Sequence, residues 1–385
     1  MWKKILNLEK LIYLTILALP TYLLRFRVLS FSVSTLDCLL LLCIAWWLII
    51  YRKEHSGKLF FKKCKFFIFS GGVMLFGLFF SVLVNKNYVP GVGIFISWFL
   101  LPIFFSLVAS SVISSEKRKN IFLAYYFSAF CVALISLVYY FFGFVTFDGR
   151  LQGFFNSPNY LAMCLAPAIF IGYGLFFELK KQKNIFLFSG ASIVLVVYLT
   201  YSYASWIAII ISLGIVLALK REMSWKISLM GFLILVVLLF SQMTTSKFSA
   251  LVSYDSRSSL ASRLMIWHSA EKMLERHWIW GIGAGNFQEK YLENQKYFPP
   301  YLEWAVPHPH NLYLAFWLYG GIFGLIGFLM LVYFWFLNLF MVQKNPQLKL
   351  IGLGVMVYIL LHGLVDTTYF KNDLAVVFWL LFSVI

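Results

Sequence analysis

Charged residues are scarce in this chain of 385 residues, of which they make up only 12%. Hydrophobic residues make up 62% and aromatic residues 20%, and this balance excludes a water-soluble domain of this size. The five cysteines have no paired spacing, so nothing indicates a disulfide framework or a cysteine metal site. The composition therefore predicts a membrane protein that crosses the bilayer many times.

Several motifs of metal and nucleotide chemistry are also absent. The five aspartates form no D-x-D pair, which is the metal clamp of many nucleotide-sugar transferases. The chain contains no Walker loop, no H-E-x-x-H and no G-x-S-x-G. The sequence therefore points to no metal site and to no other cofactor.

Twelve apolar runs are long enough, or nearly so, to cross about 30 Å of hydrocarbon. They lie at 11–24, 31–51, 66–84, 89–113, 121–145, 158–177, 185–200, 204–219, 227–242, 311–342, 348–365 and 373–385. No small-residue cleavage site follows the first run, which indicates a first span rather than a removable signal. The sequence thus predicts a single all-α transmembrane domain over residues 1–385, with about 12 helices.

The net charge of +17 reports orientation rather than binding to nucleic acid. If the N-terminus is cytoplasmic, most of the Lys and Arg residues fall in segments on the inner side, and few fall in the short outer loops. The positive-inside rule therefore predicts that both termini are cytoplasmic. It also places one large loop, residues 243–310, between the ninth and tenth spans on the outer side.

This outer loop is nearly neutral, and connections of its length usually carry function. Residues 262–278 have a helical period, which predicts an amphipathic helix. Arg263 breaks the pattern because it falls on the apolar face, near the helix start, where the dipole disfavours a cation. It either extends to phosphate headgroups at the membrane or holds an anion in a cavity. The glycines of "GIGAG", 281–285, predict a structural turn rather than a dinucleotide site.

Polar side chains elsewhere also gather at the outer surface. In "VPHPH" the prolines place His310 at or next to the start of the span at 311–342. It is either a general base or a hydrogen-bonding residue at the membrane edge. Arg150 precedes the span at 158–177 and is either an anion-binding group or part of an ordinary loop. His362 and Asp366, four residues apart, are expected on one helix face, where they could hydrogen-bond to each other.

Four stretches taken in order carry a family resemblance. They are "GRLQGFFNSPNYLA", "LTYSYASWIAI", "SRLMIWHSAEKMLERHWIWGIGAGNF" and "HPHNLYLAFWLYGGIFGLIG". Over about residues 146–330 the chain resembles the superfamily of bacterial O-antigen ligases and related O-antigen, capsule and exopolysaccharide polymerases. The resemblance implies a GT-C-type glycosyltransferase of the cell envelope that takes a glycan from undecaprenyl diphosphate. It also implies an active site on the outer face of the cytoplasmic (inner) membrane.

The resemblance assigns roles to individual residues. It implies that His310 is the base and that Arg263 and Arg150 bind the diphosphate. We further predict that Asn311, His308 and Tyr203 contact substrate. One departure is clear, because members commonly carry an arginine where this chain has Tyr203. A single displacement by a deprotonated sugar hydroxyl, opposed by fixed cations, would invert the anomeric centre.

The partners implied are the lipid-linked donor, a glycan or lipid-linked acceptor, a flippase and a chain-length regulator. The motifs do not distinguish a ligase from a repeat-unit polymerase. Two other classes remain open, a membrane transporter and an inactive scaffold of a polysaccharide export system. A transporter predicts ionisable residues near the bilayer midplane, and the sequence has few of them.

Overall fold

The computed structural model describes residues 2–51, 65–220, 233, 236–238, 240–252, 259–294 and 306–384. The regular secondary structure of this part of the chain is helical apart from one antiparallel hairpin, formed by β1 (Arg25–Val28) and β2 (Phe31–Ser34). The predicted all-helical class is therefore confirmed with one local exception. The hairpin turn uses Leu29 with a φ of 54°, and the hairpin packs against α5 (Tyr88–Ile94).

The described residues include five helical segments that are long and apolar enough to cross a membrane. They are α4 (Lys65–Val84), α5 to α6 (Tyr88–Val112, with the π-helical stretch Phe95–Leu100 between them), η3 and α7 (Ser115–Phe141), α8 (Pro158–Glu178) and α15 (Leu312–Met341). Shorter apolar helices are α2 (Thr35–Tyr51), α9 (Lys183–Leu199), α10 (Tyr203–Leu219), α16 (Pro346–His362) and α17 (Asn372–Leu380). These helices indicate a polytopic membrane protein.

The predicted total of twelve spans stays a prediction. The ninth predicted span, 227–242, lies largely outside the described residues. The first, 11–24, corresponds to α1 (Trp2–Leu17), which begins earlier and is followed by the short helix η1 (Leu19–Leu23). Pro20 falls in the first turn of η1, where its fixed φ suits a new helix better than a continued one.

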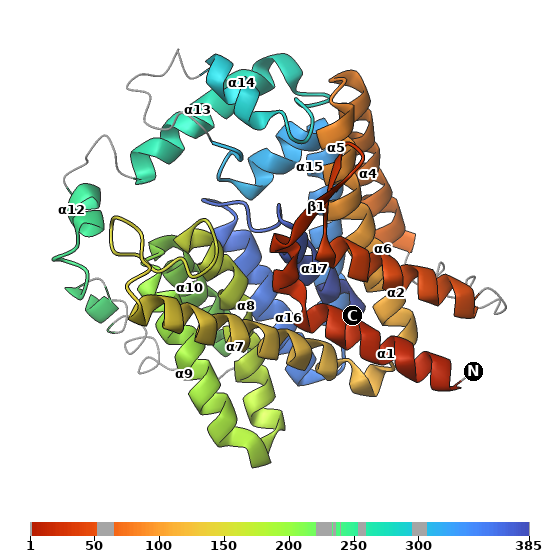
Figure 1. Ribbon diagram of the computed structural model, residues 1–385, viewed down its shortest axis with the longest axis vertical. Helices are drawn as coiled ribbons and strands as arrows, with labels where there is room; N and C mark the ends of the chain where they lie inside the picture. The colour runs from red at the N-terminus through yellow and green to blue at the C-terminus, as the bar shows by residue number, and fades with distance from the viewer. Residues whose placement is uncertain are drawn as a thin grey trace.

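The described residues of the large loop form three helices at one end of the bundle, α12 (Ser246–Val252), α13 (Ser259–His277) and α14 (Phe287–Asn294). Figure 1 shows α13 and α14 lying across this end, with α12 to one side. The segment predicted as an amphipathic helix lies within α13. Its buried side chains include Met265, Ile266, Ala270, Met273 and Leu274. The apolar face of α13 therefore packs against protein.

Small residues fix how the loop and bundle meet. α15 packs along α4, where a Cβ on Gly77 would lie 2.3 Å from the carbonyl oxygen of Gly320. α15 is broken at Gly321, whose φ is 62°. At this break the Ile322 amide donates to the carbonyls of Trp278 and Ile279, both at 3.1 Å. The end of α13 is thus hydrogen-bonded directly into the broken helix.

The glycine cluster acts as the predicted structural turn. Gly281, Gly283 and Gly285 all have positive φ, and the amide of Ile282 donates to the Leu318 carbonyl at 2.7 Å. The carbonyl of Gly281 in turn accepts from the side chain of Asn85 at 3.2 Å. The turn therefore holds the loop on α15 and on the connection after α4.

We expect Gly321→Ala to destabilise the protein strongly. A Cβ at this position would lie 1.9 Å from the carbonyl oxygen of Ile279, and φ is positive. The cost is about 2 kcal/mol or more. Gly72→Ala in α4 is the matched control, because nothing lies within 4 Å of its Cβ position. Thermal unfolding in detergent should show a lower midpoint for Gly321→Ala alone, and equal midpoints for the two variants would contradict this packing.

Candidate functional site

His310 lies immediately before α15 and is fixed there by the next residue. The side-chain oxygen of Asn311 accepts from the amides of Tyr313 and Leu314, both at 3.0 Å, and so caps the helix. Its amide nitrogen donates to the Leu364 carbonyl at 2.9 Å. His310 itself has a φ of 44°, which L-residues rarely adopt. The surrounding contacts thus hold the histidine in a strained backbone conformation, as is often found at functional sites.

The ring of His310 is paired with a buried carboxylate. Its Nδ1 lies 3.0 Å from Oδ1 of Asp366, in the loop between α16 and α17. Only 4% of the Asp366 side chain is exposed, against 34% of the His310 side chain. Because a carboxylate only accepts, Nδ1 carries the proton and the lone pair of the neutral ring is on Nε2. The partly exposed ring can therefore accept a proton from a ligand.

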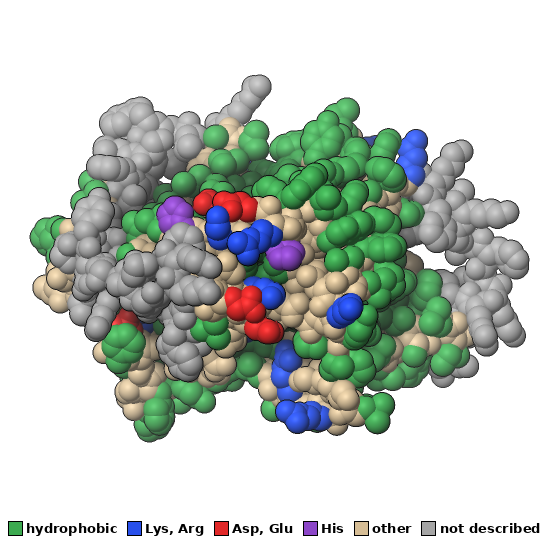
Figure 2. Space-filling model, turned by 90° about the horizontal axis from the view of Figure 1, so that it is seen from above, with side chains coloured by type: hydrophobic (Ala, Val, Ile, Leu, Met, Phe, Trp, Pro, Cys, Tyr) green, Lys and Arg blue, Asp and Glu red, His purple; other side chains and the backbone are tan. Residues whose placement is uncertain are grey.

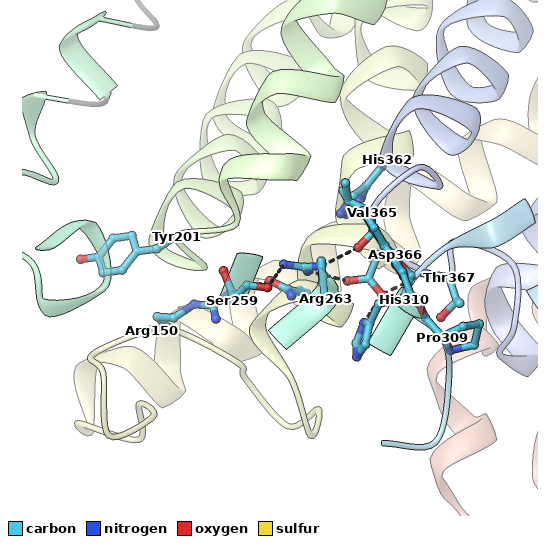
Figure 3. Close-up of polar contacts among 12 residues, drawn as sticks. Arg150, Tyr201, Ser259, Arg263, Pro309, His310, His362, Val365, Asp366 and Thr367 are labelled. Atoms are coloured by element: carbon cyan, nitrogen blue, oxygen red, sulfur yellow. Dashed lines mark hydrogen bonds and ion pairs between the residues drawn. The ribbon is translucent and has the colours of Figure 1, made fainter. Parts of the chain in front are cut away.

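Arg263 reaches the same carboxylate from α13 (Figure 3). Its Nε donates to the carbonyl of Val365 at 2.7 Å, and its Nη2 lies 3.5 Å from Oδ2 of Asp366. Burial alone would raise the pKa of Asp366, but its contact with His310, which includes the hydrogen bond from that ring, and the charge of Arg263 outweigh burial and hold this pKa well below its usual value. Asp366 is thus ionised and links the histidine to the arginine.

Arg150 joins three segments beside this group. Its Nε donates to the carbonyl of Thr200 at 2.8 Å and its Nη2 to the side chain of Asn159 at 2.6 Å. Its Nη1 lies 4.0 Å from Asp148. Burial lowers the pKa of the Arg150 guanidinium, and the nearby charge of Arg263 adds to this effect. The two arginines are therefore close enough for their charges to interact. Figure 3 shows both of them in the same part of the site.

Tyr203 and His308 complete the set of predicted site residues. Tyr203 begins α10, where its ring lies 5.4 Å from that of Trp206. The Nδ1 of His308 lies 3.0 Å from the hydroxyl of Tyr319. Removal from water, together with the charges of Lys371 and His310, lowers the pKa of His308 to about 3. At neutral pH His308 is therefore uncharged and bonded within the protein.

The expected pairing of His362 with Asp366 does not occur. α16 ends at His362, so Asp366 lies beyond the helix, where the spacing of four no longer places two side chains on one face. Nδ1 of His362 instead lies 2.8 Å from the hydroxyl of Tyr358. Sequence reasoning therefore missed the role of Asp366, although its place in a short outer loop after an apolar run was a usable signal.

The site faces the end of the bundle that carries the loop helices. Seen from this side, Figure 2 shows charged and histidine side chains gathered near the centre of a surface that is otherwise largely apolar. Within the described ranges, no three His, Cys, Asp or Glu side chains come together in a way that could hold a metal ion. At the site, Asp366 contacts Arg263 and His310, and Asp148 lies beside Arg150.

Comparison with known families adds one finding. A family model described as O-antigen ligase matches residues 186–329. This region includes most of α9, all of α10, the large loop and the first part of α15, and so contains Arg263 and His310. Arg150 and Asp366 lie outside it. No curated protein matches the chain.

Proposed function

Taking residues 186–329 as an O-antigen ligase domain, we propose that the protein is a membrane glycosyltransferase that uses a lipid-linked glycan. The donor is a glycan on undecaprenyl diphosphate, and the acceptor is a hydroxyl of another sugar. One observation carries the proposal, the Asp366 carboxylate shared by His310 and Arg263. It supports a base and an anion-binding group acting side by side, which this reaction needs.

The reaction would proceed in one displacement. The acceptor hydroxyl passes its proton to Nε2 of His310 while its oxygen attacks the anomeric carbon of the donor. The bond from that carbon to the diphosphate oxygen breaks, and the negative charge that develops on the leaving group faces Arg263 and Arg150. Ionised Asp366 stabilises the imidazolium that forms. The configuration at the anomeric carbon is inverted, and arginines supply the charge that a metal ion supplies elsewhere.

The proposed location and partners of the protein follow from the distribution of its charged residues and from the position of its large loop. The positive-inside pattern supports a bacterial cytoplasmic membrane protein with both termini in the cytoplasm and the site on the outer face. A flippase would then deliver the lipid-linked donor, and a chain-length regulator would act with a polymerase. The acceptor is a lipid A core sugar for a ligase, and the end of another repeat unit for a polymerase.

The experiment that tests this function is transfer by the purified protein in EDTA. A synthetic polyprenyl-diphosphate oligosaccharide serves as donor, and the same oligosaccharide or a core glycan serves as acceptor. We expect extended acceptor and free polyprenyl diphosphate in equal amounts, each dependent on the acceptor. Uptake of solute into proteoliposomes without any transfer would instead favour a transporter.

A further inference from the structure

Lys247 enters the site from α12, a part of the loop with no motif. Its ammonium group donates a hydrogen bond to the backbone carbonyl of Tyr201. It also lies 4.4 Å from the centre of the Tyr203 ring, within the range of a cation–π contact. The lysine therefore joins the outer loop to the turn between α9 and α10.

The groups that contact the charge of Lys247 differ in kind from those that contact the charges of the two arginines. Arg263 lies 3.5 Å from the carboxylate of Asp366, and Arg150 lies 4.0 Å from that of Asp148. The contacts of the Lys247 ammonium within the described residues are with a carbonyl oxygen and a ring, both neutral. Of these three cations, Lys247 is the one without a contacting carboxylate in that part of the chain.

The turn between α9 and α10 brings Lys247 and Arg150 together. Arg150 donates to the carbonyl of Thr200, and Lys247 donates to that of Tyr201, the next residue. Tyr201 has a φ of 48°, so this turn is strained. Burial, followed by the charges of Arg150 and Arg263, lowers the pKa of Lys247 to about 6, against the opposing charge of Asp148. All three cations therefore act on one region, which disfavours further positive charge and favours an anion.

We propose that Lys247 is a third cation of the donor site and binds the lipid diphosphate together with Arg150 and Arg263. The inference rests on the proposed function and adds a residue to it. Tyr203 supports the lysine through its ring, whose centre lies 4.4 Å from the ammonium. The outer loop thus supplies a further cation to the site, and a diphosphate has two charged phosphoryl groups that can pair with Lys247 as well as with the arginines.

The proposal has a pH consequence with a definite sign. Because the pKa of Lys247 is about 6 in the free protein, most of the lysine is neutral above that pH. The diphosphate binds the charged form, so binding takes up a proton and the affinity falls as the pH rises from 6 to 8. An arginine at 247 stays charged over this range.

The test measures the binding of farnesyl diphosphate to the full-length protein in nanodiscs. Tryptophan fluorescence detects the binding at pH values between 6 and 8. At pH 6 we expect Lys247→Met to weaken binding about tenfold or more, as for a lost charge-assisted hydrogen bond. Lys247→Arg should bind within about threefold of the wild type. Lys272→Met is the control, because Lys272 is paired with Glu275 on the outer face of α13 and should change nothing.

The pH series separates a binding role from a structural one. Wild-type affinity should fall between pH 6 and 8 relative to Lys247→Arg, since the ionisation of the probe affects both proteins equally. Calorimetry in two buffers should likewise show more proton uptake on binding for the wild type than for Lys247→Arg, since protons exchanged by the probe are common to both proteins.

Each outcome tests either the role of Lys247 or the proposed function on which that role rests. Wild-type affinity in Lys247→Met, or parallel pH profiles for wild type and Lys247→Arg, would overturn the role of Lys247 while leaving the proposed function in place. If the wild type itself bound neither farnesyl diphosphate nor the lipid-linked donor, the proposed function would fail first.

Discussion

Replacing His310 should reduce glycan transfer by about 10²- to 10⁴-fold, the usual contribution of a positioned general base. The expectation rests on its contact with the buried carboxylate of Asp366, which orients the ring and leaves Nε2 for the acceptor hydroxyl. His310→Ala removes the base. His310→Asn does so as well, and asparagine tolerates the positive φ at this position better than alanine does. Both variants should insert normally and still bind the donor.

The control for this prediction is His268→Ala. His268 lies on the exposed face of α13, where 59% of its side chain is accessible and it pairs with Glu271. Its removal should leave transfer unchanged. The assignment of His310 as the base would be contradicted if folded His310→Asn transferred glycan at a rate within about threefold of the wild type.

Replacing Arg263 should have the second largest effect, a loss of about 10²- to 10³-fold in transfer, comparable to removing one donor to a developing oxyanion. Arg263→Met removes the charge from the centre of the site. It also leaves the buried carboxylate of Asp366 without its guanidinium partner. Arg263→Lys keeps the charge but loses the planar guanidinium, which contacts Val365 and Asp366 at the same time. This variant should therefore restore only part of the activity.

A second arginine of the same helix provides the matched control. Arg276 lies in the last turn of α13 on its exposed side, and Arg276→Met should transfer as the wild type does. Weaker donor binding should accompany the loss in Arg263→Met, whereas His310→Asn should lose transfer alone. If Arg263→Met bound and transferred normally, this arginine would be only a link between the loop and the bundle.

Sequence patterns were informative where a single rule was broken. Arg263 stood on the apolar face of its predicted helix, and in the structure that face packs on the bundle, so the side chain reaches the buried Asp366. The prolines around His310 placed it at the start of a helix, and Asn311 does cap α15. In each case the local chemistry of a helix end or face required an explanation that a contact then provided.

Contacts between distant segments were beyond such patterns. Asp366 lies 56 residues from His310 in the chain, and nothing in either local sequence links them. Lys247 contacts Tyr201 and Tyr203 through a helix that has no periodic pattern of its own. The break at Gly321 also depends on a partner, since it is the end of α13 that bonds to the freed amide of Ile322. Tertiary packing decides all three.

The stereochemistry of transfer tests the central claim, that the acceptor hydroxyl attacks directly with His310 as base. A donor of known anomeric configuration would be used with the purified wild-type protein in EDTA, and the new linkage would be assigned by NMR. Inversion of the anomeric centre is the result that a single displacement predicts. Retention would contradict the account, because it requires a covalent intermediate on a nucleophile and a second displacement.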